Sequence, residues 1–137
     1  MQPKEDSSNH PFSFPKKERI CSKAILDRLM HKRQVVFFYP FKCYYDLTPC
    51  SGTDSRNIMA VSVPKKRLKH AVDRNLVKRR TREAYRLNKH IIDTLPAETG
   101  KYASMFFVFV GTEVLPFNFI NDKIISVLNR LLSDNIG

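Results

Sequence analysis

The segment 103–110 constrains the fold most strongly, because every residue in it except Ser104 is apolar. A strand-length run without polar alternation is typical of a β-strand that is buried on both faces. It is too short to cross a membrane, which takes roughly 20 apolar residues. Such a strand needs partners on both sides, and 137 residues are the size of one domain. We therefore expect a single sheet with helices packed on it.

Two further strands are predicted before this segment. Residues 35–47 are rich in aromatic and β-branched side chains, and they predict a strand that is interrupted, or begins, near Pro40. Lys42 and Tyr44 would lie on the opposite face of that strand from Phe41 and Cys43. Residues 48–56 have turn chemistry and predict a hairpin loop that leads into a strand over 57–63.

Three helices complete the expected fold. Ser22 is a suitable N-cap for a short first helix, whose apolar positions have helical spacing: Ile25, Leu26, Leu29 and Met30. A second helix covers about 70–90, and an amphipathic third helix covers 117–131. Residues 95–100, which include Pro96 and Gly100, predict a connector. The element order is αββαβα, and the fold class is α+β, a small single-domain α/β sandwich.

The expected domain spans residues 12–133. We expect residues 1–11 to be a disordered N-terminal tail, because they are polar and contain proline, and residues 134–137 to be a flexible C-terminus. The tail lacks the apolar core of a signal peptide, so the sequence predicts a cytoplasmic protein.

Positive charge is concentrated in one fifth of the chain. The whole chain has 24 Lys and Arg against 13 Asp and Glu, a formal charge of +11. Residues 64–90 alone hold eleven basic and two acidic residues, so that their net charge is +9. A surface kept soluble by diffuse charge would mix the two signs. This asymmetry indicates one basic module that binds a polyanion.

The basic residues fall on one side of the helix predicted at 70–90. At 100° per residue, the positions within an arc of about 140° that starts at Arg74 are Lys78, Lys89, Arg82, Asn75, Arg86 and Arg79. The adjacent arc is apolar and holds Val72, Leu76, Leu87, Ile91, Ala84 and Val77. Tyr85 falls inside the basic arc, where its ring could pack against a sugar or a base. Guanidinium groups suit bidentate phosphate contacts, so nucleic acid is the favoured polyanion.

The sequence contains no pattern that predicts an active site or a metal site in the protein itself. The cysteines are three, without a CxxC pair, and the four histidines do not have metal-ligand spacing. The motifs GxSxG and HExxH are absent, and four glycines are too few for a glycine-rich phosphate loop. We therefore expect no catalytic residue and no bound metal.

The stretch KHAVDRNLVKRRTRE at 69–83, preceded by SVPKK at 62–66, resembles the signature of the bacterial ribonuclease P protein component. The family pattern has nine fixed positions in these fifteen residues. All nine are present: Lys69, Ala71, Val72, Arg74, Asn75, Lys78, Arg79, Arg82 and Glu83. In outline, the resemblance extends over about 14–132.

The resemblance implies a fold and a role. The fold is an α/β sandwich with a left-handed βαβ crossover. The role is that of the small subunit of a tRNA 5′-maturation endoribonuclease, whose RNA subunit and Mg²⁺ ions carry the chemistry. The implied partners are ribonuclease P RNA and the 5′ leader of precursor tRNA, with a monomeric protein, one per RNA subunit, and no membrane.

The resemblance also implies two binding surfaces. The residues that would bind the RNA subunit are Lys65, Lys66, Lys69, Arg74, Asn75, Lys78, Arg79, Arg82 and Arg86, while Glu83 would orient neighbouring arginines. The leader would lie in a cleft between the first helix and the sheet, formed by Lys42, Tyr44, Leu26 and Met30. Family members often have aromatic residues on that helix, whereas Leu26 and Met30 can only pack against a nucleotide.

Two other functions fit the charge alone. One is a DNA-binding module that reads the major groove with the basic helix, although such domains are usually all-helical. The other is a ribosomal or assembly protein, which shares the charge but not the nine-position pattern.

Overall fold

The computed structural model describes residues 18–136 apart from 21, 33 and 51–55, so the tail predicted at 1–11 lies outside the described residues. Its centre is a four-stranded sheet with the spatial order β1-β2-β4-β3. The strands are β1 (Val35–Phe38), β2 (Phe41–Pro49), β3 (Ile58–Ser62) and β4 (Lys101–Phe109). The helices are α2 (Lys23–Lys32), α3 (Ala71–Asn88), η2 (Lys89–Ile91), α4 (Leu95–Thr99) and α5 (Phe117–Ile136).

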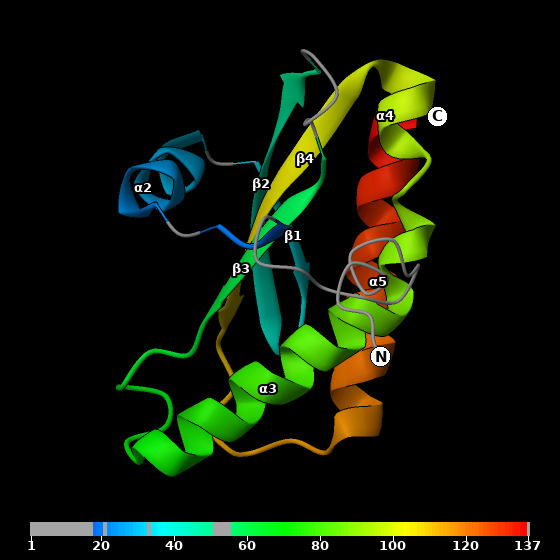
Figure 1. The fold of residues 1–137 in the computed structure, drawn as a ribbon. Coiled ribbons are helices and arrows are strands. Elements are labelled where there is room, and N and C mark those ends of the chain that lie inside the picture. The colour runs from blue at the N-terminus through cyan, green and yellow to red at the C-terminus, as the bar shows by residue number, and fades with distance from the viewer. Residues whose placement is uncertain (1–17, 21, 33, 51–55, 137) are drawn as a thin grey trace, which may run out of the picture.

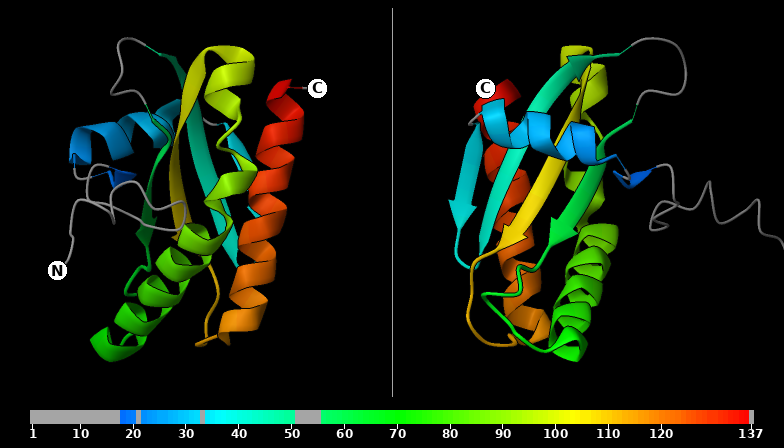
Figure 2. Two further views of the ribbon diagram at one scale, coloured as in Figure 1. Left: turned by 45° about the vertical axis from the view of Figure 1, so that its right-hand side comes forward. Right: turned by 90° about the vertical axis from the view of Figure 1, so that its left-hand side faces the viewer.

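The helices form two layers around the sheet. α2 lies across one face, and α3, α4 and α5 lie on the other (Figures 1 and 2). The larger core lies under α3, α4 and α5 and includes Phe41, Phe107 and Leu128. A smaller core lies under α2 and is built from Ile20, Leu29 and Phe106. The single-domain α+β sandwich expected from the sequence is therefore confirmed.

β4 is the strand that the apolar run 103–110 predicts. It pairs antiparallel with β2 along its whole length and parallel with β3, so it lies inside the sheet. Its side chains alternate between the two cores, and Phe107 enters the larger core while Phe106 enters the smaller one. An apolar run without alternation is required here because helices cover both faces.

The connection from β3 to β4 is left-handed. Both strands run in the same direction, and α3 and α4 connect them behind the sheet as it is seen in the right-hand view of Figure 2. In that view both strands point down, and β4 lies to the left of β3. With the helices behind the sheet, this arrangement makes the β3–α3–α4–β4 connection left-handed. Right-handed crossovers are the rule in proteins, so local sequence patterns do not predict this one. It agrees with the fold that the family resemblance implies.

The residues around Pro40 form a hairpin rather than one interrupted strand. Val35 pairs with Tyr44 and Phe38 with Phe41, so β1 and β2 run antiparallel on either side of the Tyr39–Pro40 turn, whose peptide bond is cis. With α4 included, the observed order of α-helices and strands is therefore αβββααβα, which has one strand and one short helix more than αββαβα. The sequence obscured this turn because aromatic residues continue on both sides of it.

The loop 48–56 is not a hairpin loop, which corrects the prediction from its composition. β2 and β3 are not neighbours, because β4 lies between them. Residues 51–55 lie outside the described part of the chain, so the conformation of this loop is not described further.

Two helical segments extend beyond the predicted boundaries. The expected connector at 95–100 contains α4, and Gly100, with a positive φ of 71°, is the C-cap residue that follows it. α5 continues to Ile136, three residues past the domain boundary placed at 133, and Asn135 Nδ2 donates a hydrogen bond to the Leu131 carbonyl (2.7 Å).

A buried asparagine closes the crossover. Asn57 precedes β3 and is only 8% exposed. Its Nδ2 donates to the Ile92 carbonyl just after η2 (3.0 Å), and its Oδ1 accepts from the Ala103 N–H in β4 (2.8 Å). One side chain thus joins the start of β3, the end of the α3–η2 unit and the central strand.

The short segment before α2 covers part of the β3 edge. Arg19 forms a parallel bridge with Met59, and the Ile20 N–H donates to the Met59 carbonyl (2.9 Å). Ser22 then caps α2 as predicted, since its Oγ accepts from the Ile25 N–H (3.4 Å). These contacts bring Arg19 close to α3, from which it is distant in sequence.

Candidate nucleic-acid interface

The buried stripe of α3 differs from the predicted apolar arc. The fully buried positions are Val77, Thr81, Ala84 and Tyr85. Tyr85 is 1% exposed, which corrects the prediction that its ring lies on the basic face. Val72, predicted to be apolar core, is 76% exposed because the first turn of α3 projects beyond the end of the sheet (Figure 1). A helical wheel gives relative angles only, so it cannot say which direction faces the sheet.

The predicted RNA-binding positions lie along the outer side of α3 and the loop before it. Lys65, Lys66, Lys69, Asn75, Arg79 and Arg82 are exposed, and Arg74, Lys78 and Arg86 are partly exposed. We call these nine residues the cationic surface. Lys89 does not belong to it. Its Nζ lies 2.6 Å from Glu18 Oε1, and its side chain is only 8% exposed.

The cationic surface begins at a hollow beside the N-terminus of α3. The hollow has a volume of about 520 Å³, and its lining includes His70 and five charged side chains: Lys65, Lys66, Arg67, Lys69 and Asp73. His70 is the N-cap residue, and its side chain does not cap the first turn. The free N–H groups of a helix N-terminus and the lysines around them both favour anions such as phosphate. Arg67 was not among the residues predicted from the sequence.

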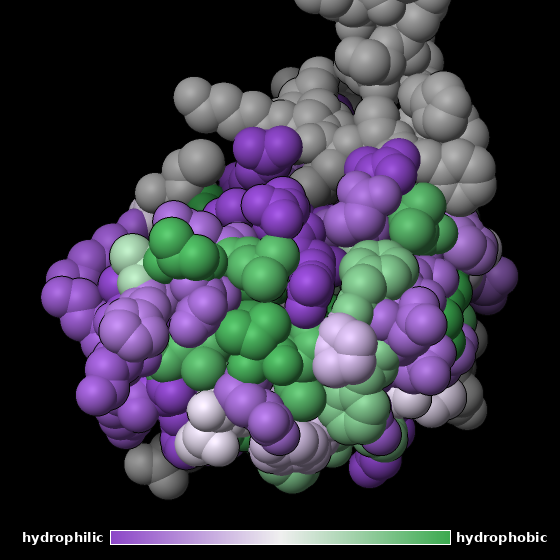
Figure 3. All heavy atoms as spheres, turned by 90° about the horizontal axis from the view of Figure 1, so that it is seen from below, coloured by the Kyte–Doolittle hydropathy of each residue, from purple (hydrophilic) through white to green (hydrophobic). Residues whose placement is uncertain are grey.

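This end of the molecule is shown in Figure 3. Hydrophilic side chains surround an apolar centre there, and the exposed Val72 belongs to the same end of α3. Hydrophilic side chains therefore form the rim of this end of the molecule and do not cover it uniformly.

Arg74 holds the loop that leads into α3. Its Nη1 donates to the carbonyls of Leu68 and Lys69, at 2.9 Å each. The guanidinium group thus holds the backbone at Leu68 and Lys69, directly before α3. Arg74 contributes to the cationic surface both through its charge and by positioning its neighbours.

A second hollow lies further along α3, where four arginines surround one carboxylate. It has a volume of about 240 Å³ and is lined by Arg19, Arg79, Arg82, Glu83 and Arg86. Arg19 comes from the segment paired with β3, and sequence reasoning missed it because a non-local bridge brings it here.

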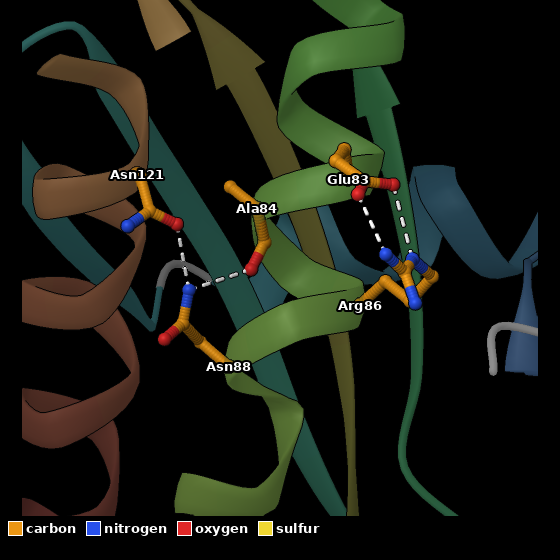
Figure 4. A network of polar contacts seen from close by, with 5 residues as sticks. All are labelled: Glu83, Ala84, Arg86, Asn88 and Asn121. Carbon is orange, nitrogen blue, oxygen red and sulfur yellow. Dashed lines mark hydrogen bonds and ion pairs between the residues drawn. The ribbon is translucent and has the colours of Figure 1, made fainter. Parts of the chain in front are cut away.

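Glu83 orients Arg86 in this second hollow, as Figure 4 shows. Arg86 Nε donates to Oε1 (3.0 Å) and Nη2 to Oε2 (2.6 Å), a bidentate pair. The hydrogen bonds from Arg86 lower the pKa of Glu83, so its carboxylate stays charged at neutral pH. The contact agrees with the orienting role that the sequence predicts. It leaves the second hollow with an excess of positive charge.

α3 is fixed to its neighbours on the side away from the cationic surface. Asn88 Nδ2 donates to the Ala84 carbonyl (2.8 Å) and to Asn121 Oδ1 on α5 (2.7 Å; Figure 4). Arg80 Nη1 donates to the Leu115 carbonyl in the loop before α5 (2.6 Å). Arg80 therefore helps to hold α3 against the rest of the domain. The arginines on the outer side of α3 are thus carried by a helix whose position is fixed.

The predicted leader cleft corresponds to the sheet face that carries α2. Leu26 and Tyr44 pack in the smaller core, and Lys42 Nζ lies 5.6 Å from the centroid of the Tyr44 ring. The structure thus brings Lys42, Tyr44 and Leu26 together. Met30 lies on the same helix but is 45% exposed and is not part of that core.

Part of this sheet face is not covered by α2. The helix crosses the sheet near one end of the strands and leaves the other end open (Figure 2). An ion pair between Lys32 and Asp46 (3.5 Å) lies in the covered part. Lys42, four residues before Asp46 on β2, lies toward the open part, with Val108 of β4 as its neighbour.

The described residues include no group of three or more His, Cys, Asp or Glu side chains that could hold a metal ion. Cys43 is fully buried, and burial raises the pKa of its thiol far above the usual range, so it is not a nucleophile at neutral pH. None of the described helices combines the length and apolar character that a membrane span requires.

Comparison with known sequences gives a family match over most of the chain. Residues 14–132 match the sequence model of a family described as Ribonuclease P. A relative from Porphyromonas gingivalis strain ATCC 33277, named Ribonuclease P protein component, is 34% identical over 123 residues, which cover 88% of this chain and 87% of the relative. A relative of the same name from Buchnera aphidicola subsp. Acyrthosiphon pisum is 37% identical over 76 residues, 56% of each chain.

Two solved structures share the fold. The Staphylococcus aureus RNase P protein superposes with a TM-score of 0.59 at 22% identity, and the match covers 87% of this chain and 96% of that one. A mutant of the S. aureus protein with defective mRNA degradation activity gives a TM-score of 0.63 at 24% identity, covering 85% and 90%. At these identities the likeness concerns the architecture, including the arrangement of helices around the sheet.

Proposed function

This chain belongs to the ribonuclease P protein component family and is part of a ribonuclease P holoenzyme with an RNA subunit, and we propose that it binds that RNA through the cationic surface. The protein holds the 5′ leader of precursor tRNA on the α2 face of its sheet. The RNA subunit and its Mg²⁺ ions remove the leader by hydrolysis. One protein acts with one RNA subunit, in the cytoplasm.

The observation that carries the proposal is the concentration of unbalanced positive charge on a rigid helix. Arg79 and Arg82 are exposed on α3, and the nearby Glu83 is already paired with Arg86. Like charges held together destabilise the folded protein unless an anion offsets them. A phosphate backbone supplies that anion and adds a salt-dependent affinity through counterion release.

The protein acts on the reaction through electrostatics and positioning. RNA helices that pack together repel one another, and Mg²⁺ normally offsets this repulsion. Lys and Arg side chains on the cationic surface replace part of that ionic requirement. The leader, a single strand, suits the other surface because aromatic and apolar side chains there contact bases while Lys42 contacts phosphate.

Reconstituted cleavage tests the proposal. Folded recombinant protein added to its cognate RNA at low Mg²⁺ should raise the rate of precursor-tRNA cleavage and lower the Mg²⁺ concentration needed for half-maximal rate. An unrelated basic protein of similar charge serves as the control. Absence of stimulation by folded protein would contradict the function. Competition by structured RNA, but not by duplex DNA at the same salt, separates this function from DNA binding.

Tyr44→Ala is expected to weaken holoenzyme affinity for precursors with long leaders by about fivefold. The change removes a ring on which a base stacks, and such stacking contributes on the order of 1 kcal/mol to the binding free energy. Affinity for precursors with the shortest leaders should be unchanged. Tyr44→Phe keeps the ring and should behave like the unmodified protein. The measurement is the dissociation constant for a series of leader lengths, and an equal effect at every length would place the leader elsewhere.

A further inference from the structure

An aromatic ring stands exposed on β1, beside the proposed leader site. Phe37 is 55% exposed, whereas its neighbour Val36 is 5% exposed and points into the larger core. Phe37 is the Cα partner of Lys42 across the β1–β2 pair. Directly paired residues of an antiparallel pair have their side chains on the same face. The Phe37 ring therefore lies on the face that carries α2, next to Lys42.

The other rings on this face are less accessible than Phe37. Tyr44 is partly buried, with its ring centroid 6.5 Å from that of Phe106 and with the Lys42 ammonium 5.6 Å from it. Phe106 is 8% exposed. A ring that already contacts a neighbouring ring and a cation has less surface to offer a base. Within the described part of the chain, Phe37 is the aromatic side chain of this face with the most exposed surface.

The surroundings of Phe37 suit one kind of occupant. Phe37 lies next to the β1–β2 turn with Lys42 as its cross-strand neighbour, and α2 crosses the sheet near the other end of these strands (Figure 2). β1 itself, VVFF, carries no charge. A flat apolar ring beside a single cation matches a nucleotide, whose base has a π-face and whose phosphate is anionic. The chain carries a formal charge of +11, which also favours an anionic strand over a basic peptide.

We propose that Phe37 is a base-stacking residue that extends the leader-binding face from β2 onto β1. A base of the single-stranded leader stacks on the Phe37 ring, and Lys42 neutralises a phosphate of the same strand between Phe37 and Tyr44. This inference rests on the proposed function, since it concerns the same RNA segment. It assigns the outermost stacking position to the edge strand of the sheet.

The test is the leader-length dependence of affinity in the reconstituted holoenzyme. Phe37→Ala should weaken binding of long-leader precursors about fivefold or more and leave the shortest leaders unchanged. Phe37→Trp should retain full affinity, because a larger ring still stacks. A matched control should show no change: Phe119→Ala removes an exposed ring from α5, on the other side of the sheet.

The outcomes separate this inference from the function on which it rests. If Tyr44→Ala shows the length-dependent loss and Phe37→Ala does not, Phe37 does not stack and the inference fails alone. A loss for Phe119→Ala equal to that of Phe37→Ala, or failure of Phe37→Trp to retain affinity, would also overturn it. If neither aromatic variant depends on leader length, the leader lies elsewhere and both proposals fail.

Discussion

Replacing Arg79 and Arg82 together by alanine is expected to weaken the affinity of the protein for its RNA subunit about 100-fold at moderate salt. Both side chains are exposed on the outer side of α3 and line the second hollow. A hydrogen bond to a charged group contributes on the order of 1.5 kcal/mol, and two such losses amount to about 3 kcal/mol. The plot of log affinity against log salt concentration should lose about one unit of slope per arginine.

The control for this double variant removes equal charge from another surface. Arg130 on α5 and Lys101 at the start of β4 are both exposed, and their joint replacement by alanine also lowers the net charge by two. If the controls weaken RNA binding as much as the α3 variants, the affinity depends on net charge and the cationic surface is not the interface. Arg74→Ala is a less direct probe, because it also releases the carbonyls of Leu68 and Lys69.

Asn57→Ala is expected to lower the free energy of unfolding by about 3 kcal/mol. The change leaves two buried backbone groups, the Ile92 carbonyl and the Ala103 N–H, without their hydrogen-bond partner. Each unsatisfied buried group costs about 1–3 kcal/mol. For a chain of this size the melting temperature should fall by roughly 10 °C. Urea denaturation followed by circular dichroism measures the change.

Asn129→Ala is the matched control for the stability measurement. Asn129 is exposed on α5, so its replacement should change the free energy of unfolding by less than about 0.5 kcal/mol. If Asn57→Ala were as stable as this control, Asn57 would not be what joins β3, β4 and the end of η2. Because the unfolding transition reports the whole domain, this test does not depend on RNA binding.

The sequence predicted best those features that local patterns determine. The apolar run at 103–110 is β4, and the helical spacing from Phe117 to Leu131 is the buried side of α5. The cationic surface followed from the order of residues along one helix. The hairpin at Pro40 was missed because strand-forming residues flank it without Gly or Asn.

Features that depend on distant contacts could not be predicted from local patterns. Arg19 reaches the arginine hollow only through its bridge to Met59, and Tyr85 is buried because of how α3 packs against the sheet. Phe37 falls within the strand predicted over 35–47, but a hairpin turn places its part of that segment in an edge strand. In each case the position of the residue depends on which strand or helix packs beside it. That strand or helix is distant in sequence, so local patterns do not identify it.

The position of β4 inside the sheet has a consequence for synthesis on the ribosome. β2 and β3 pair with β4 and not with each other, yet β4 is made after both of them and after α3. A nascent chain that ends before residue 101 can form the β1–β2 hairpin but no four-stranded sheet, so α3 has no surface on which to bury Tyr85. The non-local pairing must wait until residues 101–109 have been made. The basic helix therefore gains its rigid base only after β4, well after its own synthesis.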